Sequence, residues 1–302
     1  MRSKDLMRIA VTGASGFIGT ELLEYIGSHE DEISIIGLTR GGSAQADSSS
    51  CGDMSCEWRA TDFSEESLRT ALAGADVVIH LAGVRGTTSN PDDYVINEQI
   101  TENILKAMVS DGVGRIVFAS TISVYDDVDL IPWSEDTPLK GRTMYGNSKI
   151  RCEELIQQYA EESGFGYGIV RIAQVLGAGE RRRAMMNVFL DTAAAGGEIK
   201  VIGKSVAKRQ YLYVKDLVRI LTKLAAREPS DRLIVNAGMP NAYSNLEIAQ
   251  IVNRVYSNPT PINYDDATPE TIRSSCMDIT VLREQLGYEP LDMEAAVAEM
   301  KA

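Results

Sequence analysis

The chain carries three glycines in one short stretch, Val11-Thr12-Gly13-Ala14-Ser15-Gly16-Phe17-Ile18-Gly19, between an apolar run and a helical pattern. Glycines at this spacing allow a tight turn, let backbone N–H groups approach a ligand, and let the helix pack closely on the strand. Dinucleotide-binding proteins use a similar loop, G-x-G-x-x-G, to hold a pyrophosphate at the helix N-terminus. The stretch therefore predicts a dinucleotide site that uses Gly13, Ser15, Gly16, Phe17, Ile18 and Gly19.

Outward from this loop, short apolar runs alternate with longer periodic segments. We predict strands at residues 8–12, 33–38, 56–60, 76–81, 115–120 and 168–172, with helices at 17–26, from 64, at 92–110 and at 145–163. This alternation predicts an α/β fold of the Rossmann type, a doubly wound parallel sheet with helices on both faces. Ligands of such sheets bind at the carboxyl ends of the strands.

The alternation loosens beyond residue 173, which predicts a smaller C-terminal substrate-binding lobe. We expect a dinucleotide-binding domain over residues 1–176, to which residues 206–235 return, with a strand and then a helix over 211–226 rejoining the main sheet. Residues 177–205 and 236–302 would form the substrate-binding lobe.

The composition excludes several classes of partner. The chain has 302 residues and a net charge of −13, which repels nucleic acid. No apolar run is long enough to span a bilayer, so we expect no membrane partner. Four cysteines and two histidines offer neither a disulfide framework nor metal-ligand spacing, so we expect reduced thiols, no metal and a cytoplasmic location. We interpret His80 as a buried histidine with satisfied hydrogen bonds rather than a catalytic one.

The choice of cofactor depends on the end of the second strand, where an acid usually binds the ribose hydroxyls of NAD. This chain reads Gly37-Leu38-Thr39-Arg40 there. Arg40 is either a contact for the 2′-phosphate of NADP or an exposed surface residue. Asp62 and Phe63, after the third strand, are placed to meet the adenine ring, although Asp62 also fits a helix cap. The expected cofactor is NAD, with NADP open because of Arg40.

Tyr145 and Lys149 are four residues apart, on one face of a predicted helix. A free tyrosine titrates near pKa ~10, and a neighbouring ammonium group favours the phenolate. Tyr145 could then remove the proton of an alcohol during oxidation and return it during reduction. A hydroxyl group from the fifth strand is needed to orient the substrate oxygen, and Ser120-Thr121-Ile122-Ser123 supplies three.

With these motifs, the chain resembles the extended short-chain dehydrogenase/reductase family, in its nucleotide-sugar epimerase/dehydratase branch. The resemblance covers nearly the whole chain. It extends through Thr12 to Gly19, Val78 to Gly83, Asn97 with residues 101–105, Val124-Tyr125, residues 209–216 and residues 286–290. It implies that Thr121 is the catalytic hydroxyl beside Tyr145 and Lys149. It also implies cofactor contacts from Leu81, Ala82, Gly83 and Asn97, and a diphosphate contact from Arg209.

Two departures from the family pattern bear on the reaction. Gln174 stands where the family places a substrate-binding asparagine, and we further expect substrate contacts from Arg85, Thr121 and Ser123. Dehydratases of the family carry an Asp-Glu pair after the catalytic threonine, and decarboxylating relatives a glutamate. This chain has Ile122-Ser123 there, which argues against both reactions.

These observations favour an NAD(P)-dependent nucleotide-sugar 4-epimerase, acting on a UDP-sugar through a transient 4-keto sugar. A second hypothesis is an NADPH-dependent reductase of a 4-keto nucleotide sugar or another carbonyl, which Arg40 supports. A third is a non-catalytic dinucleotide-binding regulator, which the retained Tyr145/Lys149 pair disfavours. The family resemblance also implies a homodimer that pairs the helices at 92–110 and 145–163.

Overall fold

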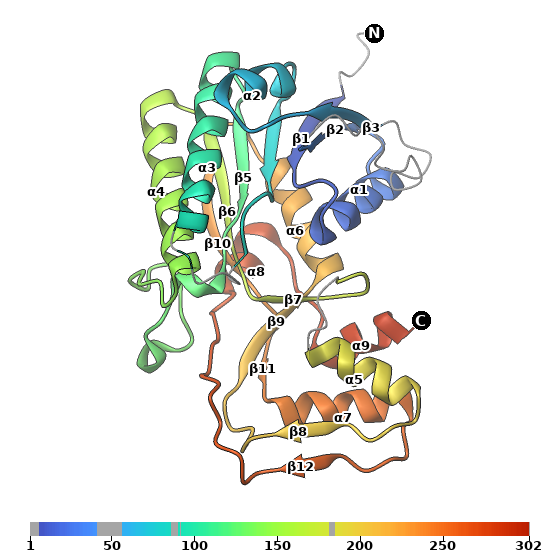
Figure 1. Ribbon diagram of the computed structural model, residues 1–302. Helices are drawn as coiled ribbons and strands as arrows, with labels where there is room; N and C mark the ends of the chain where they lie inside the picture. Colours follow the sequence, from blue (N-terminus) through green and yellow to red (C-terminus); the bar gives the residue numbers. More distant parts are fainter. Residues whose placement is uncertain (1–5, 41–55, 86–89, 91, 181–184, 302) are drawn as a thin grey trace. The chain divides into compact units, whose positions relative to one another are not determined.

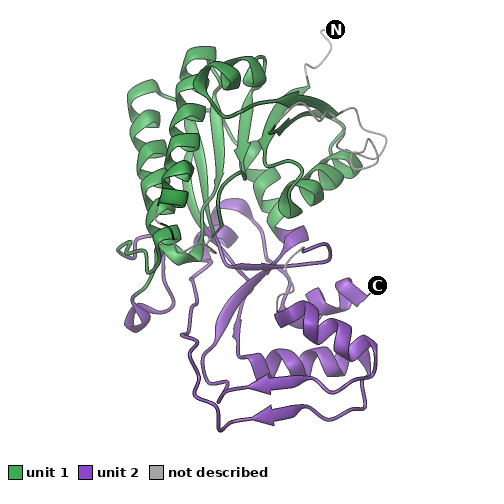
Figure 2. Cartoon of the chain, viewed as in Figure 1, with its two compact units in different colours: residues 1–126, 138–171, 217–235 green, residues 127–137, 172–216, 236–302 purple. Residues whose placement is uncertain are grey.

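The computed structural model describes residues 6–40, 56–85, 90, 92–180 and 185–301. The chain divides into two compact units, each built from three stretches of sequence (Figure 2). Unit 1 contains residues 1–126, 138–171 and 217–235, and unit 2 contains residues 127–137, 172–216 and 236–302.

Unit 1 is built on a seven-stranded sheet with the order β10-β6-β5-β4-β1-β2-β3. The strands are β1 (Met7–Thr12), β2 (Ile33–Thr39), β3 (Cys56–Ala60), β4 (Val77–His80), β5 (Arg115–Ala119), β6 (Gly166–Ile172) and β10 (Arg232–Ala237). All neighbouring strands in the order β6-β5-β4-β1-β2-β3 pair in parallel. Strand β10 runs in the same direction beside β6, as two hydrogen bonds show: Tyr167 N to Asp231 O, and Ala173 N to Ala237 O. Strand order reverses between β1 and β4, which is where such sheets bind ligands.

Helices cover both faces of this sheet, as the sequence predicts (Figure 1). They are α1 (Phe17–His29), α2 (Glu65–Leu72), α3 (Asp92–Asp111), α4 (Met144–Ser163) and α6 (Val214–Ala225). The helices α2, α3 and α4 share one hydrophobic cluster with the strands, through Leu68, Ile104 and Ile156 among others. The helices α1 and α6 lie on the opposite face. The predicted doubly wound α/β fold is confirmed.

The sequence accounts for these elements locally. All four residues of β4, Val77-Val78-Ile79-His80, are buried, because a parallel strand covered on both faces has no solvent side. Helix α4 begins where the Thr143 side chain accepts a hydrogen bond from Gly146 N, and it ends at Gly164, whose φ of 81° is left-handed.

Unit 2 holds a three-stranded sheet in the order β11-β9-β7 and a two-stranded sheet of β12 and β8. Its strands are β7 (Gln174–Leu176), β8 (Lys200–Ile202), β9 (Arg209–Tyr213), β11 (Ala242–Tyr243) and β12 (Asn263–Asp265). Its helices are α5 (Met185–Ala194), α7 (Asn245–Tyr256), α8 (Thr280–Leu286) and α9 (Met293–Lys301). Of the short 3-10 turns, η2 (Ile122–Val124) belongs to unit 1, and η3 (Val128–Leu130) belongs to unit 2.

The strand at Arg209–Tyr213 differs from the sequence-based expectation. The sequence predicts that it rejoins the main sheet, but β9 pairs with β7 and β11 in unit 2. The position beside β6 is taken by β10, which comes later in the chain. The chain therefore returns to unit 1 from Leu217 rather than from residue 206.

Candidate active site

The glycine loop lies between the carboxyl end of β1 and the start of α1. Gly13 has a φ of 72°, and a Cβ atom there would lie 3.0 Å from Ala82 N. A Cβ atom on Gly19 would lie 2.6 Å from Ala14 O, so the loop closes against its own helix only with glycine there. Ser15 and Gly16 are exposed, and the loop backbone between the two packed glycines therefore faces solvent.

The N-terminus of α1 lacks the side-chain cap that α2, α4 and α7 have. Ser64, Thr143 and Ser244 each cap their own helix with a side-chain oxygen. At α1 the N-cap is Gly16, and among the described residues no side chain caps it. Its first backbone N–H groups are therefore left for a ligand, and the positive end of the helix dipole favours an anion. This arrangement fits the pyrophosphate of a dinucleotide.

A buried hydrogen-bond chain joins β1, β4 and α3 beside this loop. Thr12 Oγ1 accepts bonds from Leu81 N and Ala82 N, both at 3.1 Å, so its own hydrogen is directed to His80 Nδ1 at 2.8 Å. We therefore assign the proton of His80 to Nε2, which lies 3.2 Å from Thr101 Oγ1. The chain of bonds sets the segment after β4 against the end of β1.

His80 is 1% exposed, and such burial disfavours the charged form of its imidazole. Burial, with a smaller contribution from the nearby Lys149 ammonium, lowers the pKa of His80 to about 3. The imidazole is therefore neutral at physiological pH. This agrees with the interpretation of His80 as a satisfied buried residue.

The predicted cofactor residues after β4 are held in place from α3. Asn97 Oδ1 accepts from Val84 N at 2.7 Å, and Asn97 Nδ2 donates to Val84 O at 3.1 Å and to Ser148 Oγ at 3.2 Å. The amide group of Asn97 is thus used to fix the backbone that follows Gly83. Gly83 itself is exposed, and Leu81 and Ala82 are half-buried, so this segment presents backbone to solvent.

The residues predicted to meet the adenosine lie after β2 and β3. Arg40 is exposed, at the end of β2. Asp62 Oδ1 accepts bonds from Ser64 N at 2.8 Å and Ser64 Oγ at 2.6 Å, and these bonds lower the pKa of Asp62. The carboxylate therefore holds Ser64, and it is Ser64 rather than Asp62 that caps α2. Phe63 is buried with a φ of 65°, a left-handed conformation that bulky residues rarely adopt.

Lys149 and Tyr145 lie on the first turns of α4. Lys149 is 5% exposed; its Nζ donates to Ala119 O at 2.9 Å and lies 4.4 Å from the centroid of the Phe118 ring. Tyr145 is half-buried, and its ring centroid lies 6.3 Å from that of Tyr94. Among the described residues none hydrogen-bonds the Tyr145 hydroxyl. It is available to a substrate.

Thr121 follows β5 and caps the short turn η2. Its Oγ1 accepts a bond from Ser123 N at 3.2 Å, which leaves its own hydrogen free to donate. The two neighbouring serines differ from Thr121 in the use of their hydroxyl groups or in burial. Ser120 is 3% exposed and its hydroxyl donates to Glu153, whereas Ser123 is half-buried. A Cβ atom on Gly146 would overlap Ser123 O, so the first turn of α4 lies directly against η2. Tyr145 and Thr121 therefore belong to one cluster.

The remaining predicted substrate residues fall in both units. Arg85 is exposed in unit 1, three residues from Ala82. Gln174 and Arg209 belong to unit 2, on the neighbouring strands β7 and β9, where Gln174 is exposed. Arg209 Nη2 donates to Asn245 Oδ1 at 3.1 Å.

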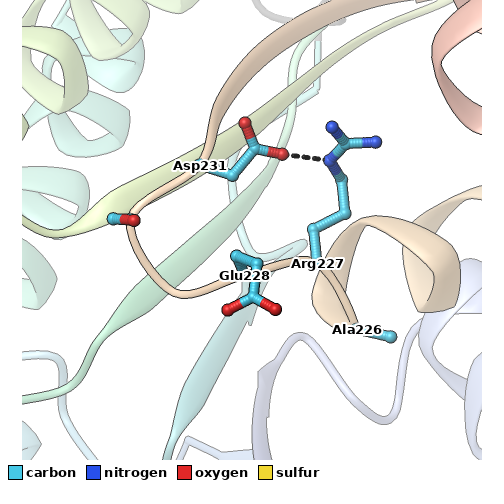
Figure 3. A pocket seen from close by; sticks show the side chains of 5 residues that line it. Ala226, Arg227, Glu228 and Asp231 are labelled. Atoms are coloured by element: carbon cyan, nitrogen blue, oxygen red, sulfur yellow. Dashed lines mark hydrogen bonds and ion pairs between the residues drawn. The ribbon is translucent and has the colours of Figure 1, made fainter.

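A surface hollow in unit 1 lies elsewhere, before the start of β10. It is lined by Ala226, Arg227, Glu228, Ser230 and Asp231, and an ion pair joins Arg227 to Asp231 across it (Figure 3). Because it precedes a parallel strand, this hollow is at the amino end of the sheet. The predicted dinucleotide and proton-transfer residues of unit 1 are all at the carboxyl end.

Four residues that shape the cluster were not predicted from the sequence as site residues. Thr12 and Thr101 hold His80, while Glu153 and Arg171 form a buried ion pair at 2.8 Å. For Glu153 the sequence offered an indication in its position, one helical turn after Lys149 on the same face of α4. Thr12 and Thr101 lie within the segments that resemble the family.

Comparison with known proteins agrees with this geometry. Residues 9–238 match the NAD dependent epimerase/dehydratase family. The chain is similar to a UDP-glucose 4-epimerase of Corynebacterium glutamicum, with 26% identity across 94% of this chain and 91% of that protein. It is also similar to UDP-glucuronic acid decarboxylase 5 of Arabidopsis thaliana, with 27% identity across 94% of this chain and 85% of that protein.

Among solved structures, the chain is similar to UDP-N-acetylglucosamine 4-epimerase from Bacillus cereus, with 31% identity and a TM-score of 0.87. The match covers 97% of this chain and 98% of that chain. Within the described part of the chain, no helix is both long and apolar enough to cross a membrane. Together with the glycine loop, the match over most of its length makes the chain an enzyme of the NAD dependent epimerase/dehydratase family.

Proposed function

We propose that the protein is an NAD-dependent UDP-sugar 4-epimerase. The observation that carries the proposal is the makeup of η2, where Ile122 and Ser123 follow Thr121 and supply no carboxylate. Dehydration and decarboxylation by this family would place an acidic group at that point, whereas epimerisation needs only oxidation and reduction at one carbon. The side chains present thus match the simplest of the family's reactions.

The chain's own residues provide proton transfer and orientation. Bound NAD would accept a hydride from the sugar and later return it. Tyr145 would remove the proton of the C4 hydroxyl and return it after the 4-keto sugar has rotated to present its other face. Thr121 would donate a hydrogen bond to the same oxygen, because Ser123 N leaves the hydrogen of Thr121 free.

Recognition of the nucleotide is assigned to cationic and amide side chains. We propose that Arg209 binds the diphosphate, since a guanidinium group matches phosphate oxygens in charge and geometry. Gln174, on the neighbouring strand, would contact the sugar. Support for uridine comes from the relatives, which are named for UDP-sugars.

The test begins with the purified protein, without added cofactor. After denaturation, the released dinucleotide is identified by chromatography and mass spectrometry. UDP-glucose, UDP-N-acetylglucosamine and UDP-glucuronic acid are then supplied separately, and the products are followed by proton NMR. The proposal predicts bound NAD and formation of the C4 epimer without added NAD(H). Net consumption of added NADPH by a keto substrate, without epimer formation, would contradict it.

A second candidate, an NADPH-dependent keto-sugar reductase, is favoured by Arg40. This side chain is exposed at the end of β2, and the adjoining Thr39 supplies no carboxylate for the ribose hydroxyls of NAD. An arginine there suits the 2′-phosphate of NADP. The same chromatography separates the two cofactors, because NADP carries an additional phosphate.

We also propose a homodimer in the cytoplasm. Helices α3 and α4 lie side by side on one face of unit 1 (Figure 1), and Val95, Ile96 and Val109 of α3 are exposed. A pair of such faces would bury these apolar side chains. In the described part of the chain, Cys152 and Cys276 form no disulfide, which suits a reducing compartment. Light scattering coupled to size-exclusion chromatography tests the dimer.

A further inference from the structure

A buried ion pair joins α4 to β6 close to the candidate catalytic residues. Arg171 Nη2 lies 2.8 Å from Glu153 Oε2, and the two side chains are 3% and 0% exposed. Arg171 Nε adds two longer bonds to the same carboxylate, at 3.2 and 3.3 Å. Burial disfavours the guanidinium cation, but the bonds and charge of Glu153 outweigh it and raise the pKa of Arg171. The three bonds therefore fix the guanidinium group relative to the carboxylate.

Further hydrogen bonds of the pair reach one chain segment, residues 120–125. At its start, Ser120 Oγ donates to Glu153 Oε1. At its end, Arg171 Nη1 donates to the Tyr125 hydroxyl at 2.7 Å, and the guanidinium carbon lies 5.3 Å from the Tyr125 ring centroid. We call Ser120, Glu153, Arg171 and Tyr125 the clamp. Thr121 is the first residue inside it.

Stability alone is a weak reason for such an arrangement. Desolvation of two buried charges offsets most of their attraction, and apolar residues of similar volume often stabilise a fold equally well. What the charges add is direction, because each bond fixes one group relative to another. Here the groups fixed are the two ends of the segment with Thr121, relative to the helix with Tyr145.

We propose that the clamp is a positioning device for Thr121. It holds the hydroxyl group of Thr121 at a fixed position beside Tyr145, so that the hydroxyl groups of both residues reach the same substrate oxygen. Glu153 sets the position relative to α4, and Arg171 sets it relative to β6. The inference rests on the proposed function, since it acts through Thr121 during proton transfer. None of the clamp residues needs to touch the substrate.

Two conservative variants test the clamp without removing a charge. Ser120→Ala deletes the bond to Glu153, and Tyr125→Phe deletes the acceptor of Arg171. With the fastest of the three UDP-sugars, each variant should lower kcat about tenfold, the size expected for a misplacement below 1 Å, while KM stays unchanged. Ile156→Val is the matched control, since it alters a buried residue of α4 outside the clamp. It should lower stability but keep kcat.

A double-mutant cycle distinguishes positioning from a general structural role. If the clamp acts through Thr121, Thr121→Ala should lower kcat, and adding Ser120→Ala or Tyr125→Phe should lower it no further. Losses that multiply in the double variants would overturn the inference. So would an unchanged kcat in both single variants. Full activity of Thr121→Ala would instead contradict the proposed function itself, and the clamp with it.

Hydrogen exchange gives a readout that needs no turnover. The amides of Val124 and Tyr125 bond to the carbonyls of Thr121 and Ile122 within the segment. In Ser120→Ala and Tyr125→Phe, we expect faster deuterium uptake in peptides covering residues 120–125, with the rest of α4 unchanged. Ile156→Val should leave this segment as protected as in the unmodified protein. Equal uptake in all proteins would count against the clamp.

Discussion

At the carboxyl ends of the strands in unit 1, polar groups are held in place but left with bonding capacity, whereas at the amino ends they are bonded to the protein itself. The contrast is clear in two cations. Lys149, at the carboxyl end, bonds Ala119 O. Arg115, at the amino end of β5, donates to the carbonyl groups of Leu224, Glu228, Asp231 and Tyr167.

The hollow before β10 lies at the amino end, where the polar groups are bonded to the protein itself. Arg227 and Asp231, which line it, pair with each other (Figure 3). The carboxyl end instead has the exposed backbone of Ser15 and Gly16 and the free hydroxyl of Tyr145. Unused hydrogen-bonding capacity selects the carboxyl end, in agreement with the family to which the chain belongs.

The largest effect that would break this comparison concerns Tyr145. Tyr145→Phe removes only the hydroxyl, so we expect kcat with a UDP-sugar to fall about a thousandfold, while NAD remains bound. Tyr159→Phe, on the same helix, is the matched control and should keep full activity. Epimerisation is measured by NMR, and bound NAD by mass spectrometry. An unchanged kcat in Tyr145→Phe would contradict the role of Tyr145 in proton transfer.

The glycine loop should give the next largest effect. Gly19→Ala places a methyl group against Ala14 O, and the resulting shift of the loop should weaken NAD binding by about ten- to a hundredfold, or 1–3 kcal/mol. Gly27→Ala changes an exposed glycine of the same helix and should leave NAD affinity unaltered. Isothermal titration with NAD measures both after removal of bound cofactor. Equal affinities would show that the loop tolerates side chains.

His80 should link stability to pH at the carboxyl end. Its pKa is about 3 when folded and near 6.5 when unfolded, so below pH 6.5 only the unfolded chain takes up a proton. The free energy of unfolding should therefore fall as the pH drops towards 3, and this residue contributes at most about 1.4 kcal/mol per pH unit. Urea unfolding of His80→Gln should lack this component. His29→Gln, at an exposed histidine, should keep it.

The smallest effect is expected at the amino end. Arg227→Ala breaks a partly exposed ion pair with Asp231, which should lower the free energy of unfolding by at most about 1 kcal/mol. Neither kcat nor KM for the UDP-sugar should change, because no chemistry is assigned to this hollow. Chemical denaturation and NMR turnover assays measure the two quantities. A change in KM would place a functional surface there and remove the distinction between the two ends.

Local patterns predicted the fold because they reflect local physics. The apolar runs became parallel strands within a few residues of their predicted bounds, and α2 begins at Glu65, one residue from the predicted start at 64. The pairing partner of Arg209–Tyr213 could not be read in this way. Its alternation fits a strand in either unit, and the choice depends on β10 occupying the edge beside β6.

The site shows the same limit. The glycine loop and the Tyr145/Lys149 spacing are contiguous motifs, so the sequence reveals them. Glu153 and Arg171 look like ordinary surface charges in sequence, since most such residues are exposed. Only the packing of α4 on β6 reveals that they are buried and paired. Likewise, the choice of Thr121 over Ser120 gains a physical reason from the bond of Ser120 to Glu153.

The division of each unit into three stretches of chain has a consequence for synthesis on the ribosome. When residues 1–171 have emerged, the sheet of unit 1 ends at β6 with an open edge, because β10 lies at residues 232–237. The guanidinium of Arg115 then also lacks three of its four carbonyl acceptors, which come from residues 224–231. An open strand edge is a site for aggregation. The nascent chain must therefore carry an unfinished nucleotide-binding half until residues 172–216 of the other unit, and then the chain through residue 237, have been made.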